Sequence, residues 1–106
     1  MKYKKLIEDK KLGTEVFSPL ACGITGKYNK DIPEGSRFDK NIDLAYIFKR
    51  YFGEDKKEKT LASLNTFQEL AAELECSMAQ LAMAWVISNP NVSTAITGAT
   101  NAEQLV

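Results

Sequence analysis

Apolar residues recur along the chain with spacings that predict helices. Between residues 60 and 75 they return every three or four positions, which indicates a helix with one apolar stripe. Residues 78–88 are apolar almost all round, which predicts a second helix buried on more than one side, with Trp85 in the core. Weaker helical patterns cover residues 3–11 and 39–52. The apolar stripe of the helix over residues 60–75 consists of Leu61, Leu64, Phe67, Leu70, Ala71 and Leu74.

Two short runs of strand-forming residues interrupt these helical patterns. One covers residues 14–18 and is closed by Pro19, and the other covers residues 92–97. Residues 23–37 lack an apolar period and are rich in Gly, Lys, Asn, Asp, Pro and Ser, which predicts a long loop of the kind that often carries function. Strands that alternate with helices predict a parallel sheet, so the fold class is α/β.

The expected helix ends carry recognisable caps. Gly13 stands where the helix expected over residues 3–11 would end. Ser77 with Gln80 forms a capping-box pattern that opens the helix over residues 78–88. A second such pattern, Thr100 with Glu103, predicts a helix that opens at Thr100. The sequence continues only to Val106, too few residues for a stable helix, and two parallel strands need neighbours. We therefore expect a piece of a larger α/β protein.

Composition excludes several classes of function. Fourteen basic residues balance fourteen acidic ones, so no long-range field attracts nucleic acid or an anionic membrane. The chain has no histidine, and Cys22 and Cys76 do not form a metal-like or redox-like pair, so no metal site is expected. No apolar run is long enough to span a membrane, and residues 1–11 are charged and contain no apolar run of the kind found in a secretory leader. These features favour a cytoplasmic protein. The charged run over residues 54–59 is typical of a solvated helix entrance or linker.

Several motifs, taken together and in order, resemble the C-terminal part of the aldo/keto reductases. The nearest likeness is to the branch that contains the voltage-gated potassium-channel β subunits, and it runs from about residue 13 to residue 106. It implies that residues 1–106 are the C-terminal portion of an aldo/keto reductase domain. The implied fold is a partial (β/α)8 TIM barrel, its last two strand–helix units, with NADP(H) as cofactor. The motifs are FSPLACG at 17–23, GKY at 26–28, Ile32-Pro33, Ser36-Arg37, QLAMAW at 80–85 and GATNAEQL at 98–105.

The same resemblance implies a set of cofactor-binding residues. Phe17 matches the aromatic residue that lies against the nicotinamide, and Lys27 and Arg37 match cationic positions near the diphosphate and adenosine. The loop departs from the channel subunits by being one residue shorter between Cys22 and Gly26. The segment along the cofactor and its diphosphate is Ser18, Pro19, Leu20, Ala21 and Cys22, and the segment around the adenosine and its 2′-phosphate contains Gly98, Thr100 and Gln104.

Plainer roles stay open for some of these residues. Cys22 is also what a small buried loop position would hold, and it lacks the neighbouring base or second cysteine of a redox thiol. Lys27 and Arg37 are also typical of solvated loop charges, and Thr100 of a helix cap.

No catalytic residue is expected in this chain. The resemblance places the family's catalytic Asp, Tyr, Lys and His before the matched region, and none of Tyr3, Tyr28, Tyr46 and Tyr51 stands in a catalytic context. The first hypothesis is a part of an NADPH-dependent reductase whose parent acts on a small aldehyde or ketone, and which is inactive in isolation. The second is a regulatory subunit that binds a potassium-channel subunit, and the third is a truncated product without activity of its own. A homo-oligomer is compatible with each.

Overall fold

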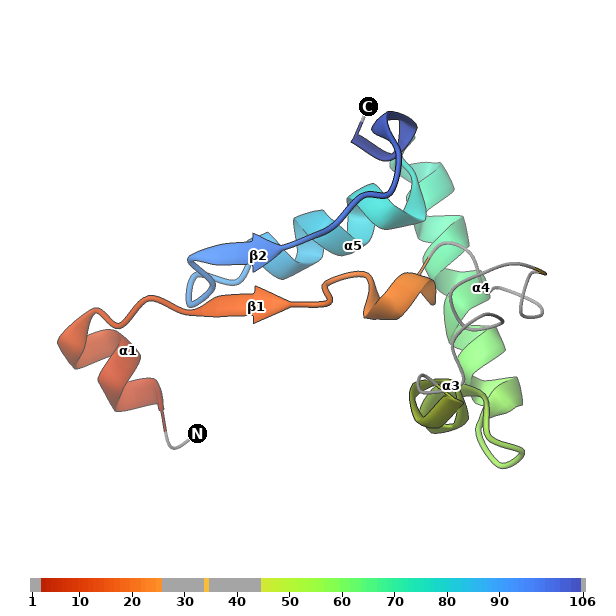
Figure 1. The fold of residues 1–106 in the computed structure, drawn as a ribbon, viewed down its shortest axis with the longest axis horizontal. Helices are drawn as coiled ribbons and strands as arrows, with labels where there is room; N and C mark the ends of the chain where they lie inside the picture. Colours follow the sequence, from red (N-terminus) through yellow and green to blue (C-terminus); the bar gives the residue numbers. More distant parts are fainter. Residues whose placement is uncertain (1–2, 26–33, 35–44, 106) are drawn as a thin grey trace.

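The computed structural model describes residues 3–25, 34 and 45–105, and shows a mixed α/β arrangement with two parallel strands. The strands β1 (Glu15–Phe17) and β2 (Thr94–Ile96) lie side by side, although the helices separate them in the sequence (Figure 1). The predicted α/β class and parallel sheet are thereby confirmed. The helices are α1 (Lys4–Lys10), α3 (Ala45–Phe52), α4 (Lys57–Glu73) and α5 (Met78–Ile87), and the short 3₁₀ turns are η1 (Ala21–Gly23) and η3 (Ala102–Leu105).

The sheet has one partly covered face and one bare face. Val16 pairs in register with Ala95, and both are half-buried, while the residues before and after each of them are exposed. Successive side chains of a strand point to opposite faces, so the exposed residues share one face. Helix α5 packs against β2. We call the exposed face the bare face; it consists of Glu15, Phe17, Thr94 and Ile96.

Hydrogen bonds fix the start of the two strands relative to each other. The backbone N–H of Thr14 donates to Ser93 Oγ at 3.1 Å, and the Ser93 N–H donates to the Thr14 carbonyl at 2.9 Å. The Thr14 hydroxyl also donates to the carbonyl of Asn91. These bonds set the register before the strands begin.

The helices α4 and α5 form where the apolar pattern predicted them. The capping box predicted at Ser77 is confirmed, because the Gln80 N–H donates to Ser77 Oγ at 3.1 Å and the Ser77 N–H donates to Gln80 Oε1 at 2.8 Å. Helix α4 begins at Lys57, so the charged run over residues 54–59 is divided between a turn and the first helical turn. Residues 39–44, the first part of the helix expected over residues 39–52, lie outside the described part of the chain.

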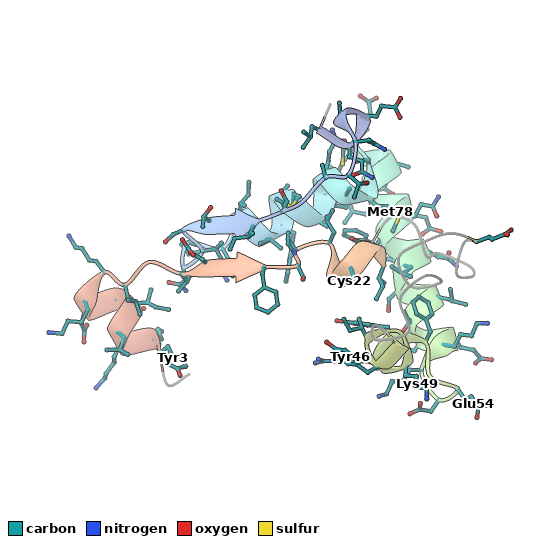
Figure 2. The ribbon with its side chains drawn as sticks, in the orientation of Figure 1. Tyr3, Cys22, Tyr46, Lys49, Glu54 and Met78 are labelled. Carbon is teal, nitrogen blue, oxygen red and sulfur yellow. The ribbon has the colours of Figure 1, made fainter. Side chains whose placement is uncertain are left out.

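The hydrophobic core lies where η1, α3 and α4 meet, not over the sheet. Ile24, Phe52 and Leu64 are buried together, and Cys22 and Met78 are among the partly buried residues packed against them. Figure 2 shows Cys22 on η1, beside α4. The loop after β1 is thus anchored on the helices at the far end of the molecule.

Three local expectations were wrong. Trp85 is 75% exposed, because α5 has neighbours in α4 and β2 but its remaining surface is uncovered in the described part of the chain. Lys11, with φ 52°, takes the left-handed position at the end of α1 that was expected of Gly13. The segment expected to be a helix from Thr100 is the short turn η3, which begins at Ala102.

The chain exposes more surface than a folded protein of its mass normally does. Its accessible surface is 8646 Å², whereas a monomer of 11.8 kDa typically exposes about 5,900 Å². Its radius of gyration is 15.7 Å, compared with about 13 Å for a typical domain of this length. A large share of the surface is therefore available for further packing.

Among the described helices, none is by itself long and apolar enough to cross a bilayer. Only when taken together are helices α4 and α5 long and apolar enough for a membrane span, and the two are bent by 91° relative to each other.

Candidate functional site

The segments that follow β1 and β2 leave the sheet at the same edge. Phe17 and Ile96 are the last residues of the two strands and are partners in the parallel register. Residues 18–25 and 97–105 therefore both start from the carboxyl edge of the sheet (Figure 1). The fold brings the starts of two predicted groups to this edge: Phe17 with the loop after it, and the segment that contains Gly98, Thr100 and Gln104.

Phe17 presents its side chain to solvent at this edge. It is 82% exposed on the bare face, and its register partner Ile96 is 52% exposed. An aromatic ring with an exposed face beside an aliphatic side chain can stack on a flat ligand ring. The Phe17 side chain is therefore placed to stack on the ring of a ligand. It does not belong to the described hydrophobic core.

The loop after β1 has an unusual backbone. Ser18, Ala21 and Cys22 have φ values of 54°, 48° and 61°, a left-handed conformation that non-glycine residues seldom adopt, and Gly23 follows with φ 100°. Each such residue costs on the order of 1–3 kcal/mol, and several together are typical of ligand-binding loops.

Local hydrogen bonds hold this strained loop in place. The Ala21 N–H donates to the Ser18 carbonyl at 2.9 Å, and the Gly23 N–H donates to the Leu20 carbonyl at 2.8 Å. The Thr25 hydroxyl donates to the same Leu20 carbonyl at 3.1 Å. Together with the packing of Ile24 and Cys22 into the core, these bonds make the loop a defined structure.

The segment after β2 is held by a different cap from the one predicted. Gln104 Oε1 accepts hydrogen bonds from the Thr100 N–H at 2.8 Å and from the Thr100 hydroxyl at 3.3 Å, and the Gln104 N–H donates to Asn101 Oδ1 at 3.2 Å. Asn101, not Thr100, caps the turn, and the side chain that bonds back to Thr100 is that of Gln104, not Glu103. Asn caps helices at least as well as Thr, so the sequence already contained this alternative, shifted by one residue.

Gly98 stands in open space between β2 and this turn. A Cβ atom added there would meet no described atom within 4 Å. The backbone at this position is therefore accessible to a ligand.

An open groove runs beside β1, on the side of α5, and was not anticipated from the sequence. Its volume is about 580 Å³. The sequence pattern predicted Trp85 in the core, whereas the exposed Trp85 is one of the residues that line the groove. Its lining residues are Val16, Phe17, Ser18, Pro19, Trp85, Val86, Ser88, Asn89 and Val92.

Two predicted site residues, Lys27 and Arg37, lie outside the described residues. Within the part of the chain that the structure describes, no three His, Cys, Asp or Glu side chains come together as metal ligands. Cys22 and Cys76 are both free and partly buried.

Comparison with known proteins identifies the family. The model of the aldo/keto reductase family matches residues 2–106. The chain belongs to the aldo/keto reductase family. The resemblance seen in the sequence motifs is thereby confirmed.

Curated relatives of this aldo/keto reductase chain carry channel-subunit names. It is 45% identical over 97 residues, 90% of its length, to a "Probable voltage-gated potassium channel subunit beta" of Oryza sativa subsp. japonica. It is 42% identical over 96 residues, 89% of its length, to a protein of the same name from Arabidopsis thaliana. The chain spans about 28% of the length of each of these relatives.

Proposed function

We propose that this chain supplies cofactor-binding residues to an NADPH-dependent aldo/keto reductase. In this proposal β1 and β2 are the seventh and eighth strands of a (β/α)8 barrel, and residues 1–106 are the C-terminal portion of the domain. The observation that carries the proposal is the parallel pairing of Phe17 with Ile96. Active sites of such barrels lie at the carboxyl ends of the strands, and phosphate groups often bind at the loops after the last two strands.

The loop after β1 fits the nicotinamide and diphosphate part of the cofactor. The exposed ring of Phe17 offers a stacking face for the nicotinamide. Leu20, with φ −95° and ψ 13°, is followed by the left-handed Ala21 and Cys22. The Ala21 and Gly23 N–H groups bond within the loop, so a backbone anion site here would use the N–H groups of Leu20 and Cys22. Ser18 to Cys22 would thus line the diphosphate, with Lys27 adding positive charge.

The segment after β2 would bind the adenosine end. The open backbone at Gly98 allows close approach, and the Thr100–Gln104 hydrogen bonds hold the turn that follows it. Because η3 has only four residues, we assign no helix dipole to this site. Arg37 would contribute a guanidinium group, which suits a phosphate or a stacked adenine.

The chain's own part in the reaction is to hold and orient the cofactor. When bound, NADPH supplies the hydride for an aldehyde or ketone. The protonating tyrosine is assigned to the part of the family's domain that this chain does not match. Figure 2 shows Tyr3 beside α1 and Tyr46 on α3. The isolated chain should therefore show negligible turnover.

A graft tests this proposal. The matched segment of an aldo/keto reductase that has been shown to bind NADPH is replaced by residues 13–106 of this chain, and NADPH fluorescence is titrated. We expect binding to be retained, and Phe17→Ala to weaken it by about 3- to 10-fold, because an aromatic stack contributes on the order of 0.5–1.5 kcal/mol.

Leu74→Ala in the same graft is the control, since Leu74 is an exposed residue at the end of α4. It should leave the NADPH affinity unchanged. A graft with native-like circular dichroism that does not bind NADPH would contradict the proposal.

The names of the relatives favour a second candidate function. A chain this similar to proteins named as potassium-channel β subunits could act as part of a regulatory subunit that docks on a channel. The test is co-purification with the cytoplasmic domain of a voltage-gated potassium channel. Retention on the channel domain, but not on an unrelated protein, is the expected result, and absence of retention across candidate channels would count against it.

A further inference from the structure

Both strands of the sheet are short, so their backbone ladder alone leaves the register open. Strands β1 and β2 have 3 residues each, and hydrogen bonds between backbone groups can re-form after one strand slips along the other. Burial adds little, because Val16 and Ala95 on the covered face are only half-buried. A slip by two residues would keep the same faces and would displace Phe17 by about 7 Å along β2.

Side-chain hydrogen bonds at the start of the strands distinguish one register from the others. The Thr14 N–H donates to Ser93 Oγ at 3.1 Å, and the Thr14 hydroxyl donates to the Asn91 carbonyl. Ladder bonds use groups that every residue carries, whereas these two bonds need a hydroxyl group at one position. They therefore form in a single register. We call these two bonds the clamp.

The surroundings of the clamp keep its partners in place. A Cβ atom added at Gly13 would lie 3.1 Å from Ser93 Oγ, so the absence of a side chain at Gly13 gives the hydroxyl its room. Asn89 Oδ1 accepts a hydrogen bond from the Asn91 N–H at 3.0 Å, and the Asn89 carbonyl accepts one from the Val92 N–H at 2.9 Å. The turn that presents the Asn91 carbonyl is thus itself fixed.

We propose that Ser93 and Thr14 are positioning residues for the cofactor site at the opposite end of the strands. They precede β2 and β1, whereas the site begins at Phe17 and Ile96, where the strands end. The clamp fixes the offset between Phe17 and the segment that follows Ile96, and therefore the span that a dinucleotide has to match. The inference rests on the cofactor role in the proposed function, but the register can be measured without cofactor.

Disulfide trapping in this chain measures the register. Glu15→Cys with Thr94→Cys joins two register partners. Glu15→Cys with Ile96→Cys joins residues offset by two positions, about 8 Å apart and beyond the reach of a disulfide. Peptide mapping of the oxidised chain separates these bridges from any that involve the two native cysteines. We expect the first pair to bridge preferentially, and Ser93→Ala to lower that preference by about 3-fold through the loss of one hydrogen bond.

Two further variants separate the clamp from general stability. Ser63→Ala also removes an exposed hydroxyl, which donates to the Lys59 carbonyl at 2.9 Å inside α4, and it should leave the preference unchanged. Gly13→Ala keeps both hydroxyls but crowds Ser93 Oγ, so it should lower the preference, although alanine restricts the unfolded chain. Gly13→Ala also replaces Ser93→Ala if the latter loses its helical circular dichroism.

The graft that tests the proposed function adds the cofactor readout. In that proposal NADPH spans both segments, whereas 2′,5′-ADP lacks the nicotinamide and does not report the position of Phe17. Ser93→Ala should weaken NADPH binding by about 3-fold and leave 2′,5′-ADP binding unchanged. A mere loss of folded protein would weaken the binding of both ligands equally. Ser93→Thr keeps the hydroxyl and should restore the NADPH affinity.

Each result supports or overturns the inference. A lowered trapping preference together with a selective loss of NADPH affinity supports it. A graft that binds no NADPH, while trapping still depends on Ser93, counts against the proposed function but not against the control of the register by the clamp. Trapping that neither Ser93→Ala nor Gly13→Ala changes overturns the inference, whatever the graft binds. Equal weakening of NADPH and 2′,5′-ADP binding overturns it as well.

Discussion

Residues whose hydrogen-bonding partners lie nearby in the sequence behave as the sequence predicts. Ser77 caps α5 because its partner, Gln80, is only three residues away, and both bonds of the capping box form. At Thr100 the same rule predicted a cap by Thr100 with Glu103, whereas the cap that formed is centred on Asn101. Local patterns predict that a cap exists more reliably than they predict which residue provides it.

The Ser77 cap can be tested by removing its hydroxyl. Ser77→Ala leaves an N–H group at the start of α5 without its partner, so we expect a loss of about 1 kcal/mol of stability. The control is Ser63→Ala, where the hydroxyl donates to the Lys59 carbonyl inside α4 and where alanine is the better helix former. Thermal melts followed by far-ultraviolet circular dichroism should show a lower midpoint for Ser77→Ala only. Equal midpoints for the two variants would contradict the role of the cap.

At the scale of elements, apolar spacing predicted the existence of each helix and strand but not which faces are covered. The stripe of α4 includes Leu64, which is buried against α3 residues, and also Leu70 and Leu74, which are exposed. All three obey the same period. Spacing defines a stripe, whereas burial depends on whether a neighbouring element reaches each part of it.

Helix α4 offers a direct test of this difference. Leu64 is 7% exposed and belongs to the core cluster, so Leu64→Ala should cost about 2–5 kcal/mol through lost burial and the cavity that remains. Leu70→Ala changes the same atoms at an exposed position of the same helix and should cost less than about 1 kcal/mol. Urea titrations report both values. A large loss for Leu70→Ala would mean that its face is covered in solution.

At the scale of the whole molecule, the apolar pattern predicted more burial than the described part of the chain shows. The all-round apolar pattern of α5 predicted burial of Trp85, yet the described part of the chain leaves that side open. The strained loop after β1 could not be foreseen either, because Ser18, Ala21 and Cys22 are not residues that favour left-handed backbone. The site residues came from family motifs, and the structure adds the register that brings their segments to one edge.

The incomplete burial has a measurable consequence for unfolding. The unfolded chain would expose about 17,100 Å², so folding to 8646 Å² hides only about three quarters of the surface that a typical domain of this mass hides. The urea m-value scales with the surface exposed on unfolding. We therefore expect an m-value for the isolated chain of about three quarters of that typical for a 106-residue domain. The titration is repeated at tenfold lower protein concentration, because self-association would make the transition depend on concentration. A full-sized m-value that does not depend on concentration would show that folding hides as much surface as in a typical domain, and would contradict this prediction.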